Sequence, residues 1–169
     1  MKLTTRQLTL CALLTAMALA LSYLENLLPL AVPIPGVKLG LANIVTVFAL
    51  YALGPRQSLM ILAARCLLGA MFAGNMNALL FSLLGGFAAM LTMIGLVRLR
   101  RFSVYGVSVG GAAAHNCGQI AAALLTLGST APLYYLPVLL AVSLLTGGLT
   151  GLASACLFRG LRAALNPAA

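Results

Sequence analysis

Six long apolar runs, separated by short stretches rich in Pro, Gly, Asn or basic residues, dominate the sequence. A membrane-spanning helix takes roughly 20 apolar residues, so six of them would use about 120 of the 169 residues and leave no room for a soluble domain. The mean hydropathy of +1.12 is far too high for a soluble domain of this size. The sequence therefore predicts an all-α integral membrane protein, a six-transmembrane-helix bundle that forms one domain over residues 1–169.

The predicted helices end where these interruptions fall. Their ranges are 8–28, 39–53, 58–72, 77–96, 104–127 and 136–157. The second and third runs are short for a full span, so they either re-enter the membrane or extend into their flanks. The first run continues to Leu28 without a clean small-residue cleavage site, which favours a retained helix over a signal peptide.

The basic residues indicate the orientation of the bundle. With both termini inside, the inner tails and loops hold Lys2, Arg6, Arg56, Arg98, Arg100, Arg101, Arg159 and Arg162, and the outer set is Lys38 alone. Because positive residues stay on the cytoplasmic side, this split predicts a multi-pass protein of the cell membrane with both termini in the cytoplasm. The net charge of +9 is thus an orientation signal, and no nucleic-acid partner is expected.

Glu25 is the only acidic residue in the chain. Active sites with paired carboxylates, including the Asp-rich Mg-diphosphate sites of prenyl synthases, are therefore excluded. The chain has one His and no Asp, and Cys117 lies on another helix face than His115, so no metal site is expected. No P-loop is present for a nucleotide. We predict a protein that is not an enzyme and has no cofactor. The cysteines are expected to be small buried hydrophobes rather than disulfides or redox centres: Cys11, Cys66, Cys117 and Cys156.

A set of polar residues interrupts the apolar runs, mostly toward the predicted outer half. Its members are Glu25, Lys38, Asn43, Arg65, His115, Asn116 and Gln119. Ionisable residues inside a membrane mark substrate sites by default, and two cations favour a ligand with a carboxylate, a phosphate or an electron-rich ring. We predict that these residues bind a small molecule captured from outside.

Several alternatives stay open for individual members of this set. Arg65 is expected to face inward, with Glu25 or a substrate anion as its partner, unless its side chain snorkels to a lipid phosphate. Glu25 is either that partner or a surface carboxylate. His115 and Gln119 share one helix face, where with Asn116 they either line a polar cavity or join helices by hydrogen bonds.

Alanines repeat every four residues on the first predicted helix, at Ala12, Ala16 and Ala20. Such a small-residue stripe lets another helix approach closely. From spacing alone, docking of a partner and packing inside the bundle are equally supported. The same spacing recurs in two glycine pairs that are expected to pack internally: Gly106 with Gly110, and Gly147 with Gly151.

A group of motifs covering nearly the whole chain resembles one family. The motifs are Tyr23-Leu-Glu25-Asn26 with Pro29, Pro35-Gly36-Val-Lys38-Leu-Gly40-Leu-Ala-Asn43-Ile-Val-Thr, Arg65-Cys-Leu-Leu-Gly69 with Gly74, Ser82-Leu-Leu-Gly85-Gly86, Ser108-Val-Gly110-Gly111, His115-Asn116-Cys-Gly-Gln119, and Tyr135-Leu-Pro137 with Gly147-Gly148 and Gly151. On these residues the sequence resembles the Gx transporter family, also labelled heptaprenyl diphosphate synthase component I. That family is similar to the S components of energy-coupling factor (ECF) transporters.

The resemblance to S components implies a substrate-binding subunit that joins a coupling transmembrane subunit and two ATPase subunits. It also implies that the alanine stripe contacts the coupling subunit, and that the ligand lies near the outer side, under the loop that includes residues 33–38. The ligand motifs of vitamin-specific S components are not found, so the cargo is open among anionic, aromatic and isoprenoid-type precursors.

The family's second label implies an alternative, a non-catalytic membrane partner of a heptaprenyl diphosphate synthase. Its contact would be the cytoplasmic residues Arg98, Arg100 and Arg101. A stand-alone permease is a third possibility, although six helices are few for alternating access unless the chain dimerises.

Overall fold

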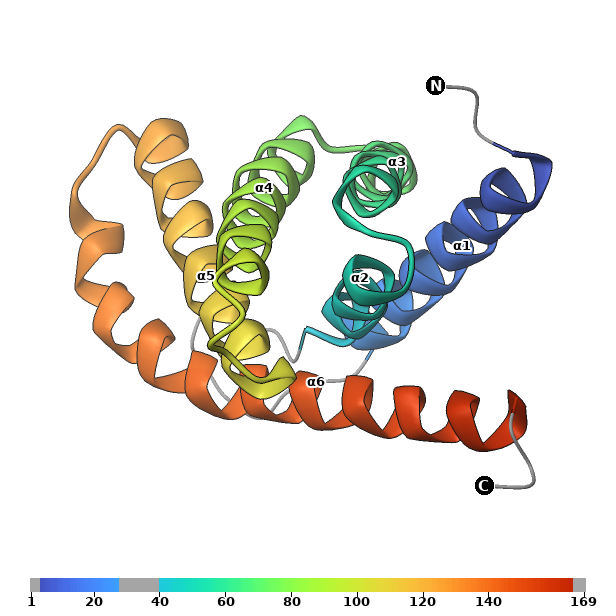
Figure 1. Cartoon of the computed structure of the whole chain (residues 1–169). Coiled ribbons are helices and arrows are strands. Elements are labelled where there is room, and N and C mark those ends of the chain that lie inside the picture. Colours follow the sequence, from blue (N-terminus) through green and yellow to red (C-terminus); the bar gives the residue numbers. More distant parts are fainter. Residues whose placement is uncertain (1–3, 28–39, 166–169) are drawn as a thin grey trace.

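The computed structural model describes residues 4–27 and 40–165, and these form a helical bundle without strands (Figure 1). The elements are α1 (Thr5–Leu27), α2 (Leu41–Ala52), α3 (Pro55–Ala73), α4 (Met76–Arg98), α5 (Val104–Leu127), the 3₁₀ helix η1 (Ala131–Tyr135) and α6 (Leu136–Leu165). The predicted all-α membrane bundle of six helices is thereby confirmed. The last helix runs eight residues beyond its predicted end, from 157 to 165.

Local signals explain where most helices begin and end. Pro55 opens α3, where its missing N–H is no loss, and Gly74 ends that helix with a φ of 60°. The side chain of Asn75 caps α4, and that of Ser103 caps α5 by accepting a hydrogen bond from the Gly106 N–H. These caps lie between the predicted runs, so the predicted boundaries of α1 to α5 differ from the observed ones by at most three residues.

Helix length separates the elements that can cross a membrane from the one that cannot. Four segments are long and apolar enough to span it: Thr5–Glu25, Pro55–Ala73, Met76–Arg98 and Ala131–Gly160. The 24 residues of α5 are also long enough, at about 36 Å, although polar side chains lower its hydropathy. The 12 residues of α2 reach only about 18 Å. The chain is therefore a multi-pass membrane protein in which α3 extends into its flanks, and the described residues of α2 are fewer than a full span needs.

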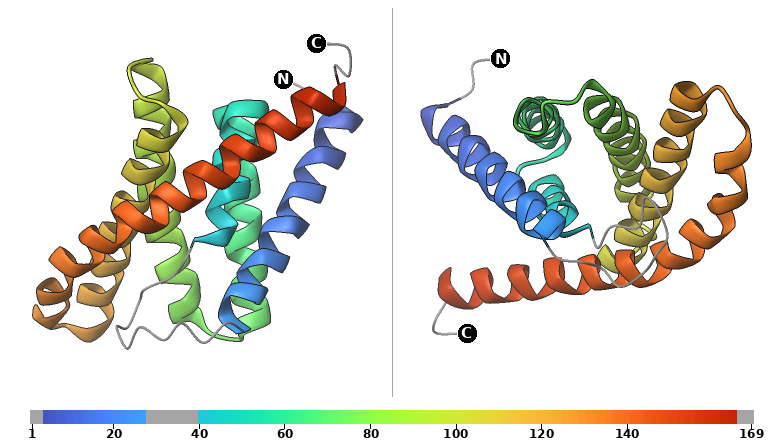
Figure 2. Two further views of the ribbon diagram at one scale, coloured as in Figure 1. Left: turned by 90° about the horizontal axis from the view of Figure 1, so that it is seen from below. Right: turned by 180° about the vertical axis from the view of Figure 1, so that it is seen from behind.

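The helices form a ring in the order α1, α3, α4, α5, α6 and α2, each packed against the next (Figures 1 and 2). Glycines bring α5 close to both of its neighbours. A Cβ on Gly118 would overlap the backbone of Leu84 in α4, and a Cβ on Gly147 of α6 would lie 2.6 Å from the Cα of Val109. Such backbone-to-backbone contact increases dispersion between helices in lipid. The internal packing predicted for Gly147 is confirmed.

The other three glycines of the predicted pairs differ in the atoms that lie nearest to them. A Cβ on Gly151 would lie 3.0 Å from the Cα of Tyr105, and one on Gly110 would lie 2.5 Å from the Leu96 side chain in α4. Both glycines therefore pack internally, as predicted. The atoms nearest to a Cβ on Gly106 belong to Phe102 and Ser103, just before α5, so internal packing of Gly106 between helices stays a prediction.

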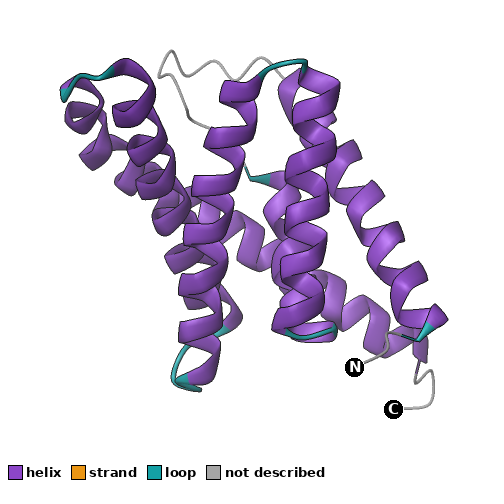
Figure 3. Cartoon of the chain, turned by 90° about the horizontal axis from the view of Figure 1, so that it is seen from above, coloured by secondary structure: helices purple, strands orange, loops and turns teal. Residues whose placement is uncertain are grey.

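The connections between helices alternate between the two ends of the bundle (Figures 2 and 3). The start of α1, the α2–α3 turn, the α4–α5 loop and the end of α6 lie at one end, and residues 74–75 and 128–130 lie at the other. Six arginines near the first end are exposed: Arg6, Arg56, Arg98, Arg100, Arg101 and Arg159. We call this the basic end of the bundle.

The four cysteines are free, but they do not share one environment. Cys11 and Cys66 are buried, whereas Cys117 and Cys156 are exposed. The prediction that all four are buried is therefore wrong for Cys117 and Cys156. Because an apolar side chain suits both the lipid-facing surface and the interior, hydrophobicity alone does not separate the two positions in a membrane protein.

Candidate substrate-binding site

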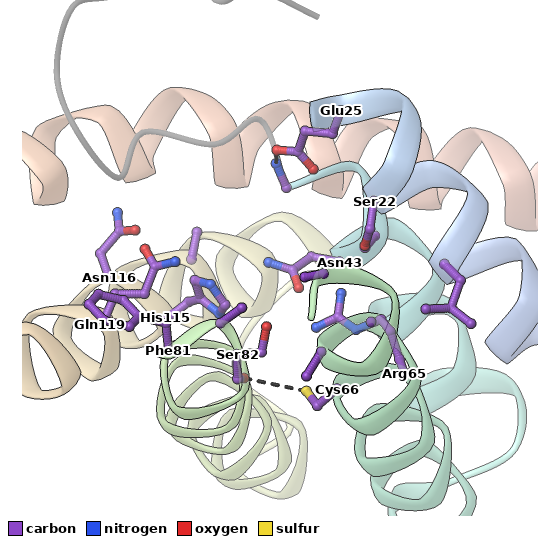
Figure 4. A pocket seen from close by; sticks show the side chains of 18 of the residues that line it. Ser22, Glu25, Asn43, Arg65, Cys66, Phe81, Ser82, His115, Asn116 and Gln119 are labelled. Carbon is purple, nitrogen blue, oxygen red and sulfur yellow. Dashed lines mark hydrogen bonds between the residues drawn. The ribbon is translucent and has the colours of Figure 1, made fainter. Parts of the chain in front are cut away.

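A cavity of about 220 Å³ lies inside the ring, with walls from all six α-helices (Figure 4). It occupies the half of the bundle away from the basic end, because its walls include Ala73 at the end of α3 and Ala78 near the start of α4. Six of the seven predicted site residues line it: Glu25, Asn43, Arg65, His115, Asn116 and Gln119. The seventh, Lys38, lies outside the described residues.

Arg65 extends into this cavity from near the midpoint of the 19-residue helix α3, about 15 Å from its start. Figure 4 shows its guanidinium and the Asn43 amide within the same cavity. The prediction that Arg65 faces inward is confirmed. In the part of the chain that the structure describes, no ion pair joins it to Glu25, whose carboxylate oxygens are bound elsewhere.

Glu25 holds the start of α2 against the end of α1. Its side chain is buried, with 7% exposed, and its two carboxylate oxygens accept hydrogen bonds from the N–H groups of Gly40 and Leu41, at 2.7 and 3.1 Å. A carboxylate is favoured there because a helix N-terminus carries unpaired N–H groups and the positive end of the dipole. Gly40 has a φ of 78°, which favours glycine. The lone acid thus caps a helix, and its contact with substrate stays a prediction.

We expect Glu25→Ala to destabilise the bundle by about 2 kcal/mol, because two buried charge-assisted hydrogen bonds are lost. Glu25→Gln is expected to lose less, since its amide oxygen still accepts from one N–H group. The measurement is the apparent Tm of the purified protein in detergent. Equal Tm values for wild type and Glu25→Ala would show that the cap contributes nothing.

The three polar residues of α5 have different surroundings. Asn116 donates a hydrogen bond from Nδ2 to the Leu139 carbonyl of α6, at 2.8 Å, so it joins two helices. The His115 ring packs on Gly85 of α4, where an added Cβ would lie 2.9 Å from Cε1. The Oε1 atom of Gln119 is buried and accepts no hydrogen bond from any described residue. Of the two predicted roles, Asn116 therefore joins helices by a hydrogen bond. The Oε1 atom of Gln119 is still available to accept one.

One family model covers most of the chain. The model described as heptaprenyl diphosphate synthase component I matches residues 14–157. The chain belongs to this family. The family resemblance predicted from the motifs is confirmed, and the name describes its members as one component of a larger system. No curated protein and no solved structure matches this chain.

The wall of the cavity also includes residues that were not predicted from the sequence. They are Ser22, Cys66, Phe81, Ser82, Thr146 and Thr150, together with small apolar side chains. Two of them had a signal in the sequence, because Thr146 and Thr150 lie four residues apart and therefore share one face of α6. Cys66 donates its S–H to the Ser82 carbonyl, at 3.4 Å, which joins α3 to α4 beside Arg65.

The cavity combines one guanidinium with amide, imidazole and hydroxyl groups on an otherwise apolar wall. Its one carboxylate is bound to the start of α2. A charge near the middle of the membrane is costly unless an opposite charge or water accompanies it. The arrangement is therefore suited to binding a small polar molecule that carries an acidic group.

Proposed function

We propose that this chain is the substrate-binding S subunit of an ECF-type importer, which captures a small anionic, aromatic or isoprenoid-type precursor from outside. The observation that carries this proposal is the cavity lined by all six helices, with Arg65 facing into it. A coupling transmembrane subunit and two ATPase subunits would supply the energy. The similarity of the family to S components supports the same assignment.

The position of the basic end supports capture from outside. Positive residues near membrane spans stay on the cytoplasmic side, so the basic end and both chain ends belong in the cytoplasm of a cell-membrane protein. The cavity lies in the opposite half of the bundle and is therefore nearer the outer surface. A ligand would then enter from outside, and its release inward would require the partner subunits.

The surface of α1 supports docking of the coupling subunit. Ala12, Ala16 and Ala20 are all exposed, whereas Leu14 and Ala18 of the same helix are buried against the bundle. The alanine stripe is thus not occupied by internal packing. A stripe of small residues on an exposed membrane helix gives a second helix a close approach.

Arg65→Ala is expected to weaken binding of the captured molecule by roughly tenfold or more, because a desolvated charge contact is lost. Native mass spectrometry of the gently solubilised wild type would identify the small molecule that accompanies the chain. The affinity of that molecule is then measured for wild type, for Arg65→Ala and for the control Arg98→Ala at the basic end. Equal affinity in wild type and Arg65→Ala would assign Arg65 a structural role only.

The family description also supports a second candidate, a non-catalytic membrane partner of a heptaprenyl diphosphate synthase. Arg98, Arg100 and Arg101 are exposed together at the basic end, where a soluble acidic partner could reach them. The same mass spectra separate the two candidates. A chain that retains a synthase, and neither a coupling subunit nor a small molecule, would favour the synthase partner.

A further inference from the structure

The size of the cavity limits the molecule that it can enclose, if the chain is the binding subunit proposed above. At roughly 30 Å³ for each small group, the volume of about 220 Å³ holds on the order of ten non-hydrogen atoms. A heptaprenyl chain has about 35 carbon atoms and would need on the order of 1,000 Å³ at the same density. The cavity within the described walls is therefore suited to a compact molecule, and a long prenyl chain would extend beyond it.

One side of the cavity favours an acidic group. The Arg65 guanidinium faces the cavity, and the only acidic side chain of the sequence is bound to the N–H groups of Gly40 and Leu41. The charge of Glu25 is thus already balanced by the start of α2. An anion that enters the cavity would therefore meet an available cation with little competition from the protein's own carboxylate.

The other side of the cavity favours a hydrogen-bond donor. Gln119 lies on α5, which is not a neighbour of α3 in the ring, and Figure 4 shows it across the cavity from Arg65. Its Oε1 atom is buried and accepts no hydrogen bond within residues 4–27 and 40–165. Buried acceptors are almost always satisfied, and leaving one unsatisfied costs about 1–3 kcal/mol. A bound molecule with an N–H or O–H group could satisfy it.

We infer that the cargo is a compact acid of on the order of ten non-hydrogen atoms, with a hydrogen-bond donor at the end opposite its acidic group. The acidic group pairs with Arg65, and the donor bonds to Oε1 of Gln119. The body of the molecule contacts apolar side chains of the wall, among them Leu19 and Phe81. Arg65 and Gln119 together thus determine which molecules bind.

The test uses the full chain in lipid nanodiscs and three matched probes. 4-Hydroxybenzoate carries the acid and an opposite donor, benzoate lacks the donor, and 4-hydroxybenzamide lacks the charge. We expect 4-hydroxybenzoate to bind roughly tenfold more tightly than either of the other two, as one lost charged or hydrogen-bonded contact implies. Farnesyl diphosphate, a longer prenyl anion, is expected not to displace it.

Two variants assign each preference to one residue. Arg65→Gln should remove the advantage of the acid over the amide, and Arg65→Lys should keep part of that advantage. Gln119→Leu should remove the advantage of the hydroxyl group over benzoate. Each variant should still bind the probe that lacks the group concerned, and its Tm in detergent, compared with that of wild type, shows that it is folded. Matched controls at the basic end, Arg98→Gln and Gln57→Leu, should behave as wild type.

The outcomes distinguish this inference from the proposed function. If the amide binds as well as the acid, or if Arg65→Gln keeps the preference, the compact-acid class is wrong. If farnesyl diphosphate binds in an Arg65-dependent way and the hydroxybenzoate does not, the class is again wrong but the binding subunit stands. If no probe binds and the purified chain carries no small molecule, both proposals fail.

Discussion

Gly118→Ala is expected to destabilise the bundle by about 3 kcal/mol, the upper part of the usual range for overpacking a core. The added Cβ would overlap the backbone of Leu84 and lie 2.8 Å from the Cα of Gly85, so no side-chain rotation could relieve it. The two helices would have to separate along the α4–α5 contact. Because both are long and α5 also packs on α6, the strain would reach most of the cavity wall.

The buried cysteines give a direct measurement of this loss. Cys117 and Cys156 are exposed and can be blocked first with N-ethylmaleimide, after which Cys11 and Cys66 react with a fluorescent maleimide only as the protein unfolds on heating. Gly95→Ala is the matched control, because nothing lies within 4 Å of a Cβ at that helical glycine. The control should be as stable as wild type or up to about 1 kcal/mol more stable. If Gly118→Ala had the same Tm as the Gly95→Ala control, close packing of α4 against α5 would be contradicted.

If the proposed coupling subunit docks on α1, replacing Ala12, Ala16 and Ala20 together with leucine is expected to abolish that docking and to leave ligand binding unchanged. All three side chains are exposed, so larger ones fit at the surface of α1 without disturbing the interior. Each leucine would nevertheless hold a partner helix away from the α1 backbone, and the dispersion gained by close approach would be lost. Recovery of the coupling subunit in a pull-down should fall by roughly tenfold or more, the effect of losing a few close contacts.

A control of equal hydrophobicity keeps this experiment specific. Ala121 of α5 and Ala141 of α6 are also exposed alanines, and changing both to leucine adds similar bulk away from the stripe. The control should retain the coupling subunit. The alanine stripe would not be the docking surface if the α1 variant recovered as much coupling subunit as wild type. The same conclusion would follow if the α1 variant and the Ala121/Ala141 control lost it equally.

The fold was largely predictable because its signals are local. Apolar runs between Pro, Gly and Asn located all six helices, and Gly54 with Pro55 marked the α2–α3 turn. The start of η1 at Ala131 was missed, since a single 3₁₀ turn beside a long apolar helix has no hydrophobic period of its own. The true end of α6 was missed as well, because a helix that leaves the membrane continues without an apolar pattern.

The site was predictable only as a set of residue types. Polar residues in apolar runs are rare, so Asn43, Arg65 and Gln119 were identified from the sequence, and the structure brings them to one cavity. The partner of Glu25 was not predictable. Its bonds reach Gly40 and Leu41 across 15 and 16 positions, and no local pattern encodes that approach.

The ring order divides the molecule into two halves, α1–α3 and α4–α6, which meet where α3 packs on α4 and where α2 packs on α6. Arg65 belongs to the first half and Gln119 to the second. A molecule bound to both would hold the halves together, and at a concentration of 100 times Kd it would oppose their separation by about 2.7 kcal/mol. If the proposed cargo bridges Arg65 and Gln119 in this way, the loaded protein is expected to be more rigid than the empty one. A subunit that binds only one of these forms would distinguish a filled chain from an empty one without touching the cargo.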